Sequence, residues 1–184
     1  SPTAVKMQDE KSISSWAQEA VRSFGEQGIV SGDSQKYFHP QQGLTRAEGA
    51  KLALLWLTLE IAPQRQSFID VSSSAWYASY VENACQYGLC QGIGGKRFAP
   101  QANLTREDFA VLVWRGIGSP VVDTTPRLLF QDGEKVSDYA QQAVAFLGAA
   151  GYMQGQNGFF LPQQTINREM AVTILYRVYQ DGLV

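Results

Sequence analysis

The stretch Leu44-Thr45-Arg46-Ala47-Glu48 decides the fold, because altered copies of it follow twice in the chain. Thr105-Arg106-Glu107 and Asn167-Arg168-Glu169 repeat its central tripeptide, and the three arginines are separated by 60 and 62 residues. A recurring interval of this length is typical of tandem structural repeats. The sequence of 184 residues therefore predicts three copies of a unit of about 60 residues.

The match between the copies extends well beyond the tripeptides. Each copy has an aromatic residue 12 positions before a glycine, a second glycine four positions later, and then a Phe-x-Pro turn. In chain order these are Trp16, Gly28, Gly32 and Phe38-His39-Pro40; Trp76, Gly88, Gly92 and Phe98-Ala99-Pro100; Tyr139, Gly151, Gly155 and Phe160-Leu161-Pro162. Phe68-x-Asp70 and Phe130-x-Asp132 open the second and third copies, whereas we expect Gln8 and Glu10 at this place in the first. The predicted repeats span residues 1–62, 63–124 and 125–184.

Each copy is predicted to fold as helix, loop, helix. The first helix should begin near the aromatic residue, carry an apolar stripe such as Ala20, Val21 and Phe24, and end at a left-handed glycine cap. The second should begin at the tripeptide, where Thr45 and Glu48 form a capping box. Because 60 residues alone bury little surface, the three units are expected to pack together as one mainly α module.

Composition narrows the possible functions. Hydrophobic residues make up 45% of the chain, which excludes wholesale disorder, and the net charge of −2 argues against nucleic acid as a partner. No run approaches the roughly 18 apolar residues of a membrane helix; the longest candidate is broken by Lys51 and Thr58. There is no phosphate loop or dinucleotide fingerprint, and no cofactor is expected.

These residues resemble the S-layer homology family, whose repeats combine an F-x-D opening, a helix beginning at Trp, two spaced glycines, an F-x-P turn and a T-R-A-E signature. The likeness covers almost the whole chain, and the stretch from Leu44 to Glu48 matches the signature outright. It implies a pseudo-threefold, mostly helical module that holds secreted or S-layer proteins non-covalently to a bacterial wall or envelope. Such a module is expected to be monomeric, although its full protein can belong to an S-layer lattice.

The resemblance also implies a ligand and its binding residues. The expected partner is a secondary cell-wall polysaccharide carrying pyruvylated N-acetylmannosamine, bound in grooves between neighbouring repeats. The signature arginine of the family contacts this ligand, a role that carries over to Arg46, Arg106 and Arg168. The third copy has Met170 and Tyr139 where the pattern has Glu and Trp. These departures leave open which grooves bind.

The residues themselves give an independent reason to consider an anion. Each arginine stands at the first position of a predicted helix, where backbone N–H groups and the helix dipole attract negative charge. A guanidinium matches a carboxylate with two parallel donors. The alternative is internal pairing with an acidic residue of a neighbouring repeat, for which Asp70 and Asp132 are the obvious candidates.

The other candidate groove residues have a structural alternative beside the functional one. Trp16, Trp76 and Tyr139 could stack on sugar faces, but aromatic residues in register with an apolar stripe favour core packing. Gly32, Gly92 and Gly155 could admit a ligand close to the backbone, but turns that need a positive φ are the favoured interpretation.

Two cysteines occur only in the second copy. Cys85 and Cys90 bracket Gly88, where the chain should reverse, so a disulfide between them is plausible in an exported protein. The alternative is two small buried side chains. His39 is the only histidine, which leaves too few ligands for a closed zinc site.

Catalysis is not expected within this chain. A glycosidase needs two carboxylates flanking one bond, but Glu48 and Asp108 have helix-cap positions and belong to repeated units. Two non-enzymatic alternatives stay open: a protein-interaction or structural envelope module without glycan binding, and the non-catalytic anchor of a larger wall-active enzyme.

Overall fold

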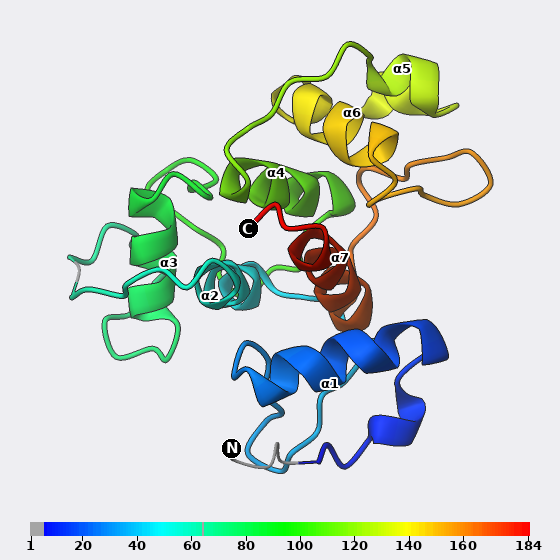
Figure 1. The fold of residues 1–184 in the computed structure, drawn as a ribbon. Coiled ribbons are helices and arrows are strands. Elements are labelled where there is room, and N and C mark those ends of the chain that lie inside the picture. The colour runs from blue at the N-terminus through cyan, green and yellow to red at the C-terminus, as the bar shows by residue number, and fades with distance from the viewer. Residues whose placement is uncertain (1–5, 64) are drawn as a thin grey trace.

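The computed structural model describes residues 6–63 and 65–184, and it is built from helices joined by loops (Figure 1). The main helices are α1 (Gln18–Glu26), α2 (Arg46–Trp56), α3 (Ala78–Gln86), α4 (Arg106–Gly116), α6 (Gln141–Ala149) and α7 (Arg168–Gln180), with the short α5 (Pro126–Leu129) before α6. Single 3-10 turns occupy Glu10–Ser12, Ser15–Ala17, Gly133–Lys135 and Asp138–Ala140. Within the described residues the only β pairing consists of isolated bridges, so the mainly α prediction is confirmed.

The second helices of the three units, α2, α4 and α7, meet at the centre, and the first helices, α1, α3 and α6, lie around them (Figure 1). Each central helix packs against the outer helix of the next unit: α2 against α3, α4 against α6, and α7 against α1. The contact of α7 with α1 joins the last unit to the first, so the three units form a closed ring. The packing therefore runs in one cyclic direction, with a pseudo-threefold axis through the centre.

A triangle of backbone hydrogen bonds lies where the central helices begin. Leu44 N–H donates to the carbonyl of Ile166 at 2.9 Å, Leu104 to that of Leu44 at 2.8 Å, and Ile166 to that of Leu104 at 3.1 Å. Each residue stands immediately before the N-cap of its helix. This triangle ties the three units together without any side chain.

Local signals account for most helix ends. Thr45, Thr105 and Asn167 each accept the N–H of the residue three positions on, and Thr45 with Glu48 forms the full capping box. Gly28, Gly88 and Gly151 have φ of 76°, 78° and 83° just after the outer helices, as a left-handed cap requires. These end signals are confirmed.

The Phe-x-Pro turns are held by aspartates. Asp70 accepts the N–H groups of Phe98 and Ala99, both at 2.8 Å, and Asp132 does the same for the third copy. In the first copy the equivalent is Asp9, so the sequence expectation of Gln8 and Glu10 at this place is wrong by one register. Asp9 precedes Trp16 by seven positions, as Asp132 precedes Tyr139, whereas the second copy has one residue fewer here, and Met7 replaces the Phe.

Candidate functional site

The signature arginines stand at the first position of α2, α4 and α7, as expected, but their helix ends do not offer free N–H groups. The N–H of Arg46 donates to Ala102 O at 2.8 Å, and that of Ala47 donates to Pro100 O at 3.0 Å. The loop of the next unit supplies both carbonyls, and the same pattern recurs at the other two helices. The expectation of free N–H groups at these helix starts is therefore wrong, whereas ligand contact by the arginine side chains stays a prediction.

The guanidinium groups join neighbouring units. Each lies over the buried phenylalanine of the next Phe-x-Pro turn, with 4.6 Å between Arg46 and the Phe98 centroid and 5.1 Å at the other two pairs. Each Nε also donates to the carbonyl oxygen of that same phenylalanine, at 2.8–2.9 Å. A stacked and hydrogen-bonded guanidinium of this kind fixes one unit on the next.

At two of the three interfaces between units, the arginine also pairs with a carboxylate. Arg168 Nη1 pairs with Glu48 Oε2, and Arg46 Nη1 lies 3.7 Å from Asp108 Oδ2. At the third interface Met170 stands in the carboxylate position, so Arg106 has no ion-pair partner within residues 6–63 and 65–184. Burial lowers the pKa of Arg106, although the charge of Asp132 opposes this. Internal pairing is thus found, but with Glu48 and Asp108 rather than with Asp70 and Asp132.

Two grooves open beside the paired arginines. Groove 1, about 640 Å³, is lined by Arg168 of α7, Gly32 of the first loop, Glu48 and Lys51 of α2, and Trp76. Groove 2, about 310 Å³, has the equivalent lining from the next unit along the ring: Arg46, Gly92, Asp108, Val111 and Tyr139. Each groove lies between units, as the resemblance implies.

The predicted core position of the aromatic residues is wrong. Trp16, Trp76 and Tyr139 are 48%, 57% and 54% exposed. They precede or occupy short turns rather than the outer helices, and the next residue in each copy, such as Ala17, is buried instead. Trp76 and Tyr139 line the two grooves.

The second glycines differ from one another. Only Gly155 has the positive φ, 70°, that the turn interpretation requires of all three. A Cβ at Gly32 would come within 2.8 Å of the Lys36 backbone, and one at Gly92 within 2.6 Å of the Phe68 ring. Close approach within the protein therefore explains glycine at these two positions.

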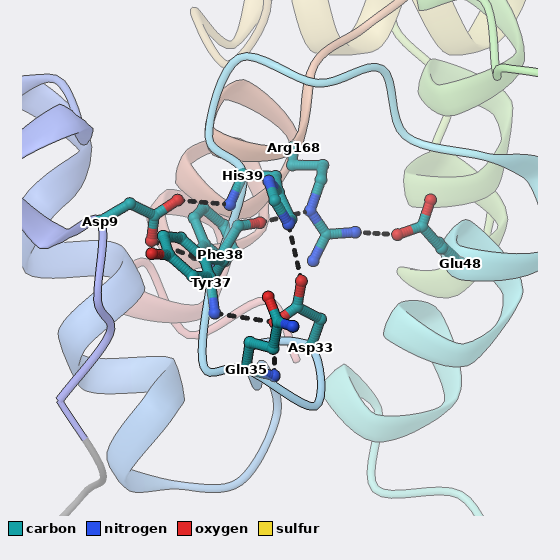
Figure 2. Close-up of polar contacts among 8 residues, drawn as sticks. All are labelled: Asp9, Asp33, Gln35, Tyr37, Phe38, His39, Glu48 and Arg168. Atoms are coloured by element: carbon teal, nitrogen blue, oxygen red, sulfur yellow. Dashed lines mark hydrogen bonds and ion pairs between the residues drawn. The ribbon is translucent and has the colours of Figure 1, made fainter.

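Groove 1 has a charged rim from the first loop (Figure 2). Asp33 accepts hydrogen bonds from the N–H groups of Gln35 and Tyr37, and its Oδ2 lies 2.8 Å from His39 Nε2. The bond from Tyr37, followed by that with His39, lowers the pKa of Asp33. Figure 2 shows Arg168 reaching from α7 toward Glu48, beside this rim.

Sequence reasoning missed several groove and interface residues. Glu107 and Glu169, just after the arginines, accept the N–H and O–H of Ser137 and Ser14 in the next unit. Tyr139 O–H donates to Asp108 at 2.5 Å in groove 2. Lys51 was also missed, although a lysine that interrupts the apolar run of α2 was a signal.

Cys85 and Cys90 lie with their sulfurs 3.6 Å apart as free thiols. Their hydrogen bond lowers the pKa of Cys85 and, together with burial, raises that of Cys90. The disulfide stays a prediction. No three His, Cys, Asp or Glu side chains among the described residues form a group that could hold a metal ion.

Comparison with known proteins identifies relatives over as much as 91% of the chain. The family model of the S-layer homology domain matches residues 7–50, 67–110 and 129–171. An amylopullulanase of Thermoanaerobacterium thermosulfurigenes is 28% identical over 171 residues, which cover 91% of this chain and 9% of that protein. The surface-layer 125 kDa protein of Lysinibacillus sphaericus is 33% identical over 111 residues, 60% of this chain and 9% of that protein.

The S-layer protein sap of Bacillus anthracis is 26% identical over 162 residues, which cover 87% of this chain and 20% of that protein. The chain thus spans a fifth or less of the length of these relatives. None of the helices in the described part of the chain combines the length and hydropathy needed to cross a bilayer.

Proposed function

Because the chain belongs to the S-layer homology domain family, we propose that it attaches its full protein to a bacterial cell surface by binding an anionic wall polysaccharide. The observation that carries this proposal is the pair of equivalent grooves between units, each with cationic side chains and an exposed aromatic ring. A pyruvylated N-acetylmannosamine-type sugar is the ligand that the family resemblance implies. Its carboxylate supplies the negative charge.

The relatives support an attachment role rather than catalysis in this segment. Proteins named as an amylopullulanase, an exoglucanase and S-layer proteins share it, although it makes up no more than a fifth of each. A segment common to such different proteins is suited to a task that they share, and residence at the extracellular surface is that task.

More than one groove would strengthen the attachment. Once one groove holds a wall polymer, neighbouring sugars reach the next groove at high effective concentration. Two weak sites can then hold the chain more firmly than either site alone, without a covalent bond.

Sedimentation with wall sacculi tests the proposal. The purified chain should sediment with sacculi that keep their acid-labile polysaccharide and should stay in the supernatant after acid has removed it. Equal retention on stripped peptidoglycan contradicts glycan binding. Retention that is lost after protease treatment of the sacculi instead favours a protein-interaction module.

A further inference from the structure

We propose that Lys51, rather than the signature arginine Arg168, supplies the positive charge that meets the acid group of the ligand in groove 1. This inference rests on the proposed function, because it assigns a residue within the same groove. It separates two tasks: Arg168 joins units, and Lys51 together with Trp76 forms the subsite for an acidic sugar.

Arg168 is already committed to contacts within the protein. Its guanidinium lies 5.1 Å from the Phe38 centroid, its Nε donates to Phe38 O at 2.8 Å, and its Nη1 pairs with Glu48. The pair is largely shielded, with 17% and 27% of the two side chains exposed. A ligand carboxylate would have to compete with Glu48 for a charge that this residue neutralises.

Lys51 has no such competitor. It follows Glu48 by three positions on α2, is partly buried and lines groove 1, but it has no ion-pair partner among the described residues. Asp33, the other carboxylate of the groove, is held by His39 and by two backbone N–H groups. After the Arg168–Glu48 and His39–Asp33 pairs are formed, the ammonium of Lys51 is the cation left to the ligand.

Aromatic rings hold this ammonium in place. Lys51 Nζ lies 5.6 Å from the Trp76 centroid and 5.4 Å from the Tyr80 centroid, within the range of a cation–π contact. Trp76 is more than half exposed, so the apolar face of a pyranose can cover its ring. A carboxylate carried at the edge of that sugar would then lie within reach of the ammonium.

Groove 2 lacks this combination. Val111 takes the place of Lys51, and Tyr139, in the place of Trp76, uses its hydroxyl on Asp108. Groove 2 has a different cation without an ion-pair partner among the described residues, Arg115 in the last turn of α4, and its lining includes no tryptophan. The two grooves therefore differ in the residues that would meet an acidic sugar, and the lysine–tryptophan subsite belongs to groove 1.

Calorimetric titration of the chain with a synthetic pyruvylated N-acetylmannosamine glycoside tests the inference. Lys51→Met keeps the apolar stem but loses the charge, so it should weaken the groove 1 site at least about tenfold or remove one site from the stoichiometry. Lys51→Arg should restore binding. Lys135→Met, at an exposed lysine outside both grooves, is the matched control and should bind like the unchanged chain.

Melting temperatures separate the two tasks. Lys51→Met should melt within about 2 °C of the unchanged chain, whereas Arg168→Met should melt clearly lower because it loses the contacts to the next unit. Unaltered affinity in Lys51→Met overturns the inference. So does a chain that sediments with sacculi but does not bind the glycoside. Failure to sediment at all contradicts the proposed function itself.

Discussion

Asp9, Asp70 and Asp132 each stabilise a Phe-x-Pro turn whose middle residue has an unfavourable backbone conformation. The middle residues of the three Phe-x-Pro turns, His39, Ala99 and Leu161, have φ of 60°, 57° and 62°. For residues other than glycine this left-handed region costs about 1–2 kcal/mol. Each aspartate accepts the N–H of the middle residue and of the phenylalanine before it, so the turn is held by two charge-assisted hydrogen bonds.

At the residue scale, the lowered pKa of Asp70 predicts that the stability of the fold depends on pH. Partial desolvation raises the pKa of Asp70, but the hydrogen bonds from Phe98 and Ala99 outweigh it and hold the pKa below its ordinary value. A carboxylate with a lowered pKa contributes stability above its unfolded pKa, about 3.9, and this contribution is lost as the pH falls through the folded value. Asp70→Asn should cost about 1–2 kcal/mol at pH 7.

Urea unfolding from pH 7 down to pH 2 checks this. The difference in unfolding free energy between the unchanged chain and Asp70→Asn should shrink below about pH 4. Asp138→Asn, at an exposed aspartate whose carboxylate accepts no hydrogen bond from residues 6–63 and 65–184, should leave the curve unchanged. A constant difference across the whole range would contradict the ionic role of Asp70.

At the scale of elements, each central helix has its first N–H groups satisfied from two sources. The cap residue of the same chain segment accepts one, and the loop of the next unit accepts two more. The hydrogen bonds from the next unit therefore both complete the helix start and join the two units. A defect in a cap weakens the interface as well as the helix.

Thr45→Ala should lower the unfolding free energy by about 1 kcal/mol, because it removes half of the capping box of α2. Thr45→Ser keeps the accepting oxygen and is the matched control, with an effect of a few tenths of a kcal/mol at most. Chemical unfolding followed by circular dichroism measures both. Equal losses in the two variants would assign the cost to the methyl group instead of the cap.

The elements also show which features a sequence can predict. The repeat period, the threonine and asparagine caps and the Gly28-type ends depend on residues a few positions apart, and they were predicted correctly. The carbonyls that bind the helix starts come from 50 or more residues away, so nothing near Arg46 signalled them. The exposure of Trp76 was missed for a related reason: a short turn before α3 shifts the inward face by one residue.

At the scale of the whole molecule, the chain folds as a closed ring in which its last unit holds its first. Glu169, only 2% exposed, accepts the N–H of Ser14 at 2.8 Å and its O–H at 2.6 Å. Arg168 pairs with Glu48, and α7 packs on α1. Because each unit is bound on two sides, the three should unfold together.

Glu169→Ala leaves the N–H of Ser14 without its acceptor, and we expect a loss of about 2–3 kcal/mol in a single transition. Far-UV circular dichroism reports on all helices, whereas the four tryptophans lie in the first two units. Coincident transitions by both probes confirm the ring. A separate early transition in circular dichroism would instead describe independent units, and Glu134→Ala at an exposed site is the neutral control.

The backbone triangle of Leu44, Leu104 and Ile166 limits how many copies can assemble around one axis. Each of the three residues donates its N–H to one of the other two and accepts with its carbonyl from the remaining one. The ring of hydrogen bonds is therefore complete with three copies, and no N–H or carbonyl in it is left for a fourth copy. In a longer polypeptide, additional copies must form a second ring of three hydrogen bonds. The number of copies should therefore rise in multiples of three.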